Sequence, residues 1–369
     1  MTELRIVRAE GEPFERGRQV GRGFRDLIER SVDFYLRYLA RRGLEGAALE
    51  RALAPYLARA REVLPGFVAQ MDGMAEGAKV PPIAIHAANA FEELESLVTA
   101  SARTDPSAPT GHIEHCSTFA VVDPGTTILG HDEQWLAGDA GCVGIVVEVM
   151  PSGTTLVSPT VPVFLPAVGM NGSGCAIGVM SLSAADDGVG VPRVLASRHA
   201  LEAVDRSDAI RRASLPGRAG GYAYLFAFRG GRALADVQGR VRGDAFVIET
   251  TGRRHAVVEG PGPHTNHYLS PELVEVGSEP SPGSRARLER LRELLVEAPP
   301  QTPEEAMRVL ADHGSSPEAI CVHAAPALGD EAGAVIFSMV CDVEEGRMWV
   351  APGNPCESAY QEVDLTGIL

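Results

Sequence analysis

The sequence predicts an α+β protein in which helices and strands come in separate blocks. Apolar residues recur at three- and four-residue steps between residues 14 and 99, and this period is typical of helices. After Thr118 the chain changes to short apolar runs separated by turn residues, which indicate antiparallel strands. Because strands and helices do not alternate one by one, a doubly wound parallel sheet is less favoured.

The first third of the chain is predicted to form a helical layer. Helices are expected over residues 14–38, 49–63 and 83–97, where the apolar period is clearest. Leu64-Pro65-Gly66 and Val80-Pro81-Pro82 separate these stretches, since proline ends or begins a helix.

The middle of the chain is predicted to form strands. Asp123-Pro124-Gly125 and Pro151-Ser152-Gly153 fall where hairpin turns are expected. The expected strands cover residues 119–122, 127–129, 143–149, 154–157 and 176–180.

The last part of the chain returns to helices and then closes with strands. Thr302 is expected to cap a helix, with Glu305 at capping-box spacing. The expected helices cover residues 193–203, 207–212, 284–297 and 303–313. The expected strands cover residues 222–228, 233–237, 245–249, 255–259, 319–322, 334–342 and 347–350.

Composition excludes several classes of partner. The formal net charge is -16 and the sequence pI is about 5.1, so neither nucleic acid nor an anionic membrane is an expected partner. The N-terminal residues form no apolar stretch of the signal-peptide kind, and a cytoplasmic location is expected. The six cysteines show no CxxC spacing, so no zinc or dithiol motif is predicted from their pattern.

Cys116 is the first candidate for chemistry. It follows a segment rich in Pro, Ser, Thr and Gly (residues 104–111), which is typical of an exposed loop, and it precedes an apolar strand. Cleavage of the His115–Cys116 bond would leave a thiol nucleophile and an amine base on one residue. Because an α-amine and a thiol titrate close together, the amine could take the thiol proton at neutral pH.

The segment His264-Thr265-Asn266-His267 is the second candidate. The Asn266 amide could donate a hydrogen bond to the oxyanion that forms in acyl transfer. An Asx-turn at a strand end explains Asn266 equally well. A metal site on His264 and His267, completed by His313 or His323, is less favoured because no acidic third ligand stands at a recognisable spacing.

The third candidate is Gly130 to Trp135. In a regular strand Asp132 and Gln134 point to the same face, where a carboxylate and an amide could hold the Cys116 amine. A polar strand end is the alternative. His313, preceded by Asp312, or His323 could instead serve as the base of a Cys-His dyad in an uncleaved enzyme.

These segments and their order resemble the acyl-coenzyme A:6-aminopenicillanate acyltransferase family of N-terminal nucleophile hydrolases. The matching motifs run along nearly the whole chain: Gly11-x5-Gly17-x3-Gly21, Leu64-Pro65-Gly66, Gly73 to Gly77, Asn89 with Glu92 and Glu93, Cys116-Ser117-Thr118-Phe119, Gly169-Met170-Asn171-x2-Gly174, Gly190 to Arg193 leading to Arg198, His264 to His267, Ser284-x2-Arg287, Ile320-Cys321-x-His323 and Gly353-Asn354-Pro355-Cys356.

The resemblance implies a four-layer αββα sandwich with an N-terminal helical segment. Residues 1–115 would form the smaller subunit and residues 116–369 the nucleophile-bearing core, and the two would stay associated after cleavage. The resemblance places the nucleophile on Cys116, the cleaved bond between His115 and Cys116, and the oxyanion amide on Asn266. Ser284, Arg287 and His264 are then assigned to substrate binding.

The implied function is an autoprocessed amidohydrolase or acyltransferase that acts on a small acylated amine, peptide or thioester. No metal or prosthetic group is implied, acyl-coenzyme A could enter only as a donor substrate, and a homo-oligomer is compatible with the family. The chain departs from the family pattern at His115, where Gly is usual, and at Asp132 and Gln134, where Asn and Asp are usual. An uncleaved Cys-His thiol hydrolase and an inactive small-molecule binding protein of the same fold therefore stay open as alternatives.

Overall fold

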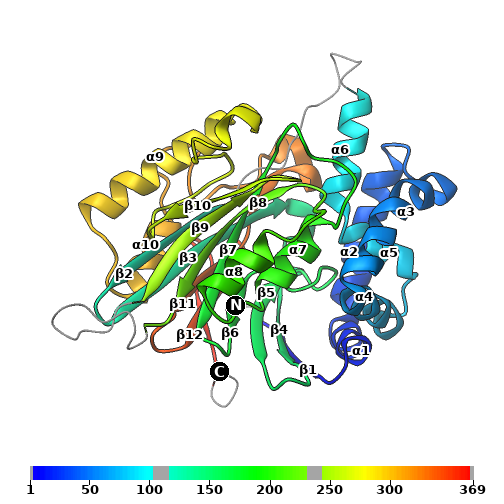
Figure 1. The fold of residues 1–369 in the computed structure, drawn as a ribbon, viewed down its shortest axis with the longest axis horizontal. Helices are drawn as coiled ribbons and strands as arrows, with labels where there is room; N and C mark the ends of the chain where they lie inside the picture. Colours follow the sequence, from blue (N-terminus) through cyan, green and yellow to red (C-terminus); the bar gives the residue numbers. More distant parts are fainter. Residues whose placement is uncertain (1–2, 103–115, 231–242, 366–369) are drawn as a thin grey trace.

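The computed structural model has two β-sheets packed between layers of helices, which confirms the predicted α+β class (Figure 1). The structure describes residues 3–102, 116–230 and 243–365. Strands β2 and β3 of the smaller sheet contact β7 and β8 of the larger one. The two sheets therefore form the inner layers of the αββα sandwich.

The larger sheet has the order β1-β4-β5-β6-β7-β8-β9-β10. Its pairs are antiparallel except for β1 with β4, which run parallel. The strands are β1 (Ile6–Glu10), β4 (Gly144–Val149), β5 (Thr155–Thr160), β6 (Gly169–Asn171), β7 (Cys175–Leu182), β8 (Gly221–Phe228), β9 (Asp244–Thr250) and β10 (His255–Glu259).

The smaller sheet has the order β13-β12-β11-β3-β2 and is antiparallel throughout. A tight turn at Pro124 and Gly125 joins β2 to β3, with Asp123 paired to Thr126, as the turn residues predicted. The strands are β2 (Ser117–Asp123), β3 (Thr126–Leu136), β11 (Gly333–Asp342), β12 (Arg347–Pro352) and β13 (Gln361–Val363).

Helices cover the outer faces of both sheets. Leu291 and Leu310 from α9 and α10 pack against Phe119 and Val340 of the smaller sheet, while α7 and α8 contact the larger sheet at β8. The helices are α1 (Pro13–Gly23), α2 (Arg25–Ala40), α3 (Gly46–Val63), α4 (Pro65–Ala78), α5 (Pro82–Ala88), α6 (Phe91–Ala102), α7 (Arg193–Ala200), α8 (Arg206–Ala213), α9 (Pro282–Glu297) and α10 (Pro303–Leu310), with 3₁₀ turns at Ala137–Asp139, Val274–Val276 and Pro326–Glu331. Thr302 caps α10 by accepting a hydrogen bond from the Glu305 backbone N–H, as predicted.

Three sequence predictions need correction or fall outside the described residues. The N-terminal segment is not helical throughout, because β1 joins the larger sheet, and its short amphipathic run gave no clear strand signal. The strand predicted over residues 319–322 is wrong, since these residues form bends that carry no ladder of hydrogen bonds. The strand predicted over residues 233–237 lies outside the described residues.

Glycine spacing explains how α1 meets α4. A Cβ atom on Gly17 would lie 1.9 Å from the Gln70 carbonyl oxygen, and one on Gly73 would lie 2.0 Å from the Phe14 carbonyl oxygen. Only glycine allows two helix backbones to come this close. The glycine motifs in these two helices are therefore packing contacts that hold α1 against α4.

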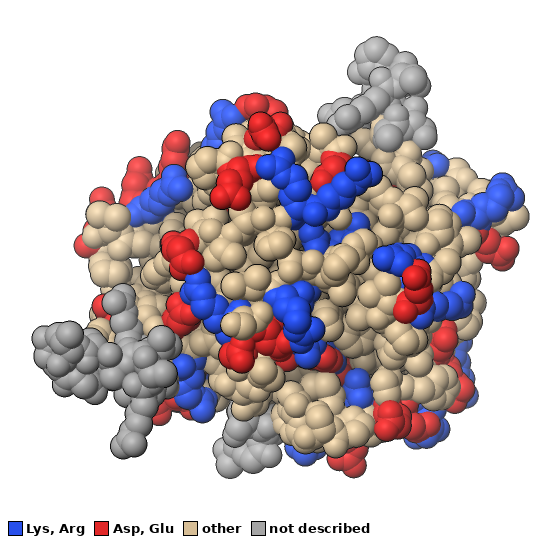
Figure 2. Space-filling view, viewed as in Figure 1, with Lys and Arg blue, Asp and Glu red and all other residues tan. Residues whose placement is uncertain are grey.

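Charged side chains of both signs are interspersed on the face shown in Figure 2. The arginines of α8 are ion-paired: Arg206 with Asp244 and Glu259, Arg211 with Asp208, and Arg212 with Glu202 and Asp208. Such pairing leaves little free positive charge on α8 for a polyanion. Among the described residues, no helix is both long and apolar enough to cross a membrane.

Candidate active site

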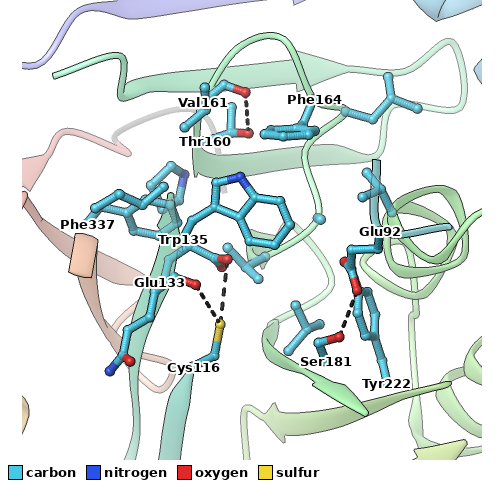
Figure 3. A pocket seen from close by; sticks show the side chains of 18 of the residues that line it. Glu92, Cys116, Glu133, Trp135, Thr160, Val161, Phe164, Ser181, Tyr222 and Phe337 are labelled. Carbon is cyan, nitrogen blue, oxygen red and sulfur yellow. Dashed lines mark hydrogen bonds between the residues drawn. The ribbon is translucent and has the colours of Figure 1, made fainter. Parts of the chain in front are cut away.

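A cavity lies between the two sheets, with Cys116 in its wall (Figure 3). The smaller sheet contributes Glu133 and Phe337, and the larger sheet contributes Ser181 and Tyr222. Most of the remaining lining is apolar: Trp135, Pro159, Val161, Phe164, Leu165, Ala167, Val168, Val179, Val194 and Ile336. A concave apolar space with a few polar groups is the usual form of a small-molecule site.

The Cys116 thiol faces a carboxylate. Its Sγ lies 3.7 Å from Glu133 Oε1 and 3.7 Å from the backbone carbonyl oxygen of Gln134. Burial raises the pKa of the Cys116 thiol well above its ordinary value, and the negative charge of Glu133 raises it further. Both effects favour the protonated thiol over the thiolate. His115, the other half of the predicted cleavage site, lies outside the described residues.

Glu133 is held in place by a chain of hydrogen bonds on β3. His131 Nε2 lies 3.0 Å from Glu133 Oε2, and His131 Nδ1 lies 2.6 Å from Thr118 Oγ1. His131 and Thr118 are fully buried. The carboxylate thus keeps one oxygen on His131 and the other toward Cys116.

Strand register explains why Glu133 reaches the thiol. Ser117 pairs with Asp132 and Thr118 with His131, so one further step places Glu133 opposite Cys116. Residues opposite each other in an antiparallel pair project from the same face of the sheet. We call the face of β3 that carries His131, Glu133 and Trp135, on the same side as Cys116, the inner face. The face that carries Asp132 and Gln134 is the outer face.

The structure does not bring the Asp132 and Gln134 side chains to the thiol. Gln134 Nε2 donates to the Ile320 carbonyl oxygen at 2.8 Å, on the outer face, and only the Gln134 backbone contacts Cys116. Asp132 is fully buried, and neither of its carboxylate oxygens has a hydrogen bond of good geometry among the described residues. Burial raises the pKa of Asp132 well above the ordinary carboxyl range. The predicted pair does share one face, but that face is turned away from the Cys116 thiol.

Asn266 lies in the cavity wall with Cys116. Its Nδ2 donates to the Ser181 carbonyl oxygen at 3.1 Å, and its Oδ1 accepts from Arg287 at 3.1 Å. Ser284 Oγ accepts the Asn266 backbone N–H at 2.9 Å. Since an amide nitrogen carries two hydrogens, Asn266 keeps one donor for a ligand.

Arg287 and Ser284 support the site from α9 and do not line the cavity. Arg287 Nη1 donates to the Cys116 carbonyl oxygen at 2.6 Å and to Ser117 Oγ at 2.9 Å. The guanidinium therefore forms hydrogen bonds to both Cys116 and Asn266. The predicted Ser-x2-Arg helix is present, but its two side chains position other groups and do not reach into the substrate space.

His264 is also outside the cavity. Its Nε2 lies 2.7 Å from Glu249 Oε1 and its Nδ1 lies 2.6 Å from the Thr265 carbonyl oxygen, so both ring nitrogens have partners. Its backbone bridges to Thr118 at the edge of β2. His264 thus anchors the segment that carries Asn266, and the structure gives it no contact with the cavity.

Comparison with known proteins assigns the chain to a family. Residues 151–357 match the model of the acyl-coenzyme A:6-aminopenicillanic acid acyl-transferase family. The chain belongs to this family. Membership indicates an enzyme of the acyl-transferase kind.

Solved structures with similar folds include two hydrolases. Penicillin V acylase from Agrobacterium tumefaciens is 13% identical, with a TM-score of 0.42 over 68% of this chain and 86% of that chain. A variant of conjugated bile acid hydrolase from Clostridium perfringens is 10% identical, with a TM-score of 0.39 over 68% of this chain and 93% of that chain. No curated protein matches the chain.

A second polar group lies across the cavity of this acyl-transferase family member. Glu92 at the start of α6 accepts hydrogen bonds from Ser181 Oγ, at 2.7 Å, and from the Tyr222 hydroxyl (Figure 3). Arg193 Nε lies 3.8 Å from Glu92 Oε2. Burial and the neighbouring Glu92 charge raise the pKa of Tyr222 well above its ordinary value. The family motif at Asn89 to Glu93 pointed to this region, but no local pattern predicts that Glu92 faces Cys116 across a cavity.

The remaining histidine candidates lie away from the thiol of this family member. Within residues 3–102, 116–230 and 243–365, no histidine ring forms a hydrogen bond to Cys116 Sγ or lines the cavity. His313 and His323 instead contact each other, beside Cys321 and Cys356. The geometry therefore offers no described histidine as the base of a Cys-His dyad.

Proposed function

We propose that this protein is a cysteine amidohydrolase or acyltransferase that becomes active when the His115–Cys116 bond is cleaved. The observation that carries the proposal is the position of Cys116, which directly precedes β2 and presents its thiol to a cavity shared with Asn266. Cleavage would leave the Cys116 α-amine beside its own thiol. That amine supplies the base that a buried, protonated thiol requires.

The proposed reaction begins with attack by Cys116 Sγ on the carbonyl carbon of an amide or thioester. The thiol proton passes to the α-amine and a carbon–sulfur bond forms. The carbonyl oxygen becomes an oxyanion, which accepts a hydrogen bond from the second Asn266 Nδ2 hydrogen. Collapse breaks the bond to the leaving amine or thiol, which takes the proton. Water or a small amine then attacks the acyl-enzyme thioester, releases the acid or a new amide, and restores the thiol.

Glu133 is the group that we assign to the Cys116 amine. After cleavage its carboxylate would stand within reach of an ammonium on the same residue as the thiol, since Oε1 already lies 3.7 Å from Sγ. A carboxylate beside an ammonium stabilises the charged form and orients its protons. Asp132 does not line the cavity, and the Gln134 side chain donates to the Ile320 carbonyl oxygen, so we assign both side chains a structural role on the outer face.

The cavity favours an apolar acyl group. Val161, Phe164 and Leu165 line it on one side and Ile336 and Phe337 on another. Burial of apolar surface is worth about 25 cal/mol per Å², so an aliphatic or aromatic acyl chain would gain most there. We therefore propose small N-acyl amines and acyl thioesters as substrates, with acyl-coenzyme A only as a possible acyl donor and no resident cofactor.

Intact-mass measurement of the purified full chain tests autoprocessing. We expect two fragments, residues 1–115 and 116–369, that stay together in size-exclusion chromatography. Cys116→Ala should stay uncut, whereas Cys175→Ala, a control at a buried cysteine of β7, should be cut normally. A cut that persists in Cys116→Ala would overturn the proposed nucleophile.

A panel of N-acyl amines and acyl thioesters tests the chemistry. The expected result is an acyl adduct on Cys116, mapped by mass spectrometry, and product release that Cys116→Ala abolishes. An uncut chain that is still acylated at Cys116 would favour an uncleaved thiol hydrolase. An uncut chain that resists every donor would favour a binding protein with this fold.

A further inference from the structure

Four side chains with metal-binding atoms converge outside the cavity. His313 follows α10, Cys321 and His323 lie in the segment before β11, and Cys356 follows β12. Their ligand atoms, two Nε2 and two Sγ, all lie within 4.8 Å of one another. None of the four residues lines the cavity that holds Cys116.

Four of the six distances between ligand atoms are close to the edges of a tetrahedron around one ion, and the two from His313 Nε2 to the sulfurs are within 4.8 Å. Zinc bonds of about 2.3 Å to sulfur and 2.0–2.1 Å to nitrogen require edges of about 3.8 Å for sulfur–sulfur, 3.3 Å for nitrogen–nitrogen and 3.6 Å for sulfur–nitrogen pairs. The structure has Cys321 Sγ to Cys356 Sγ at 3.6 Å and His313 Nε2 to His323 Nε2 at 3.2 Å. His323 Nε2 lies 3.2 Å from Cys356 Sγ and 3.9 Å from Cys321 Sγ.

Neighbouring groups are arranged as they are around bound metals. Asn354 Nδ2 lies 3.4 Å from Cys321 Sγ and donates to the Val322 carbonyl oxygen at 2.7 Å. Glu357 Oε1 lies 3.8 Å from His323 Nδ1, the ring nitrogen that points away from the cluster. Donors to a thiolate and a carboxylate behind a histidine are typical supports of metal ligands.

We propose that His313, Cys321, His323 and Cys356 bind one zinc ion. Four protein ligands leave no open position, so the ion is structural and takes no part in the acyl chemistry. It links the end of α10 to the segments beside β11 and β12. It also fixes the segment that contains Ile320, whose carbonyl oxygen accepts the hydrogen bond from Gln134. The sequence did not reveal the site because the ligands show neither CxxC nor HxxxH spacing.

A disulfide between Cys321 and Cys356 is the competing arrangement. A disulfide needs sulfurs about 2.0 Å apart and would leave the two histidines without a shared partner. The structure has both cysteines free, with His323 Nε2 in contact with each sulfur.

Metal analysis of the full chain tests the proposal. The protein is purified under reducing conditions from zinc-containing medium, dialysed, and measured by inductively coupled plasma mass spectrometry. We expect one zinc per chain, and, after exchange, a cobalt complex with thiolate charge-transfer and tetrahedral d–d absorption bands. Removal of the ion should lower the thermal midpoint by about 5 °C or more, because a tightly bound ion stabilises only the folded chain.

Two variants at exposed ligands locate the ion. His313→Asn and Cys356→Ser should each lose most of the zinc and the cobalt spectrum, whereas His255→Asn, at an exposed histidine of β10, should keep both. A folded wild-type chain without zinc or cobalt binding overturns the proposal, as does a Cys321–Cys356 disulfide in reduced preparations. Zinc that both ligand variants retain would place the ion elsewhere and overturn it too.

Discussion

The two faces of β3 carry carboxylates in opposite surroundings. On the inner face, Glu133 borders a cavity, shares one oxygen with His131 and directs the other toward the Cys116 thiol. On the outer face, the Asp132 side chain is fully buried, and neither of its carboxylate oxygens has a hydrogen bond of good geometry among the described residues. Neighbouring residues of one strand can therefore have unrelated roles, because successive side chains point to opposite faces.

The difference traces to the turn between β2 and β3. A turn whose flanking residues Asp123 and Thr126 are paired fixes the register of the whole hairpin. A register shifted by one residue would exchange the faces and bring Asp132 to the nucleophile's side. The proposed role of Glu133 thus depends on a turn at the opposite end of β2 from the thiol.

The sharpest test compares one variant on each face. Glu133→Gln should lower kcat/KM by about 100-fold or more, since loss of a group that assists proton transfer typically costs at least this much. Asp132→Asn should leave kcat/KM within a factor of about three, because its side chain contacts neither the cavity nor the thiol. Both are measured on the cleaved enzyme with the best substrate of the acyl panel.

The opposite result would reverse the comparison. Loss of activity in Asp132→Asn, with Glu133→Gln active, would show that the working enzyme uses the other face. Circular dichroism and thermal melting of each variant separate such a loss from misfolding.

Asp132→Asn should instead change how stability depends on pH. A raised pKa means that the folded chain keeps a proton that the unfolded chain has released, so this contribution to stability is complete below about pH 4 and declines as the pH rises. The decline has a limit of about 1.4 kcal/mol per pH unit for one proton. Asp132→Asn should remove it, so the free energy of unfolding from urea titrations should favour the variant more at pH 8 than at pH 5. A constant difference across this range would contradict a protonated Asp132.

Most of the fold could be predicted because its signals are local. The hairpins at Pro124-Gly125 and Pro151–Gly153 and the cap at Thr302 depend on residues next to one another, and all three are present. The parallel pairing of β1 with β4 was missed because it joins segments more than a hundred residues apart and β1 has only five residues. Non-local pairing leaves little trace in a single short strand.

The site was only partly predictable for a related reason. Cys116 and Asn266 were identified, and both line the cavity. Glu133 was missed, although a signal existed: counting back from the paired residues at the turn places it opposite Cys116. Glu92 and the cluster of His313, Cys321, His323 and Cys356 carry no such signal, because only the tertiary fold brings their elements together.

A substitution of Gln134 tests the role of the outer face of β3 while leaving the proposed reaction unchanged. Gln134→Leu should lower the free energy of unfolding by about 1 kcal/mol, since it removes one of two hydrogen bonds to the Ile320 carbonyl oxygen, which also accepts from the Val322 backbone N–H at 3.2 Å. The kcat/KM of the folded, cleaved enzyme should stay close to that of the wild type. Retained stability would show that the Ile320 segment is held by other contacts, and a large loss of activity would return Gln134 to the catalytic group.

The charge of Glu133 should also be visible in the reactivity of Cys116. Burial is the main reason that the pKa of the thiol is raised, and Glu133 raises it further. Glu133→Gln should therefore lower the pKa of the Cys116 thiol and shift the pH profile of its alkylation by iodoacetamide to lower pH. The extent of alkylation at each pH is measured by peptide mapping. Asp132→Asn is the matched control and should leave the profile in place, because the Asp132 side chain lies on the opposite face of β3 and does not contact the thiol. A shift in the control, or none in Glu133→Gln, would mean that the thiol does not sense the inner-face carboxylate, and Glu133 would lose its proposed role in holding the amine.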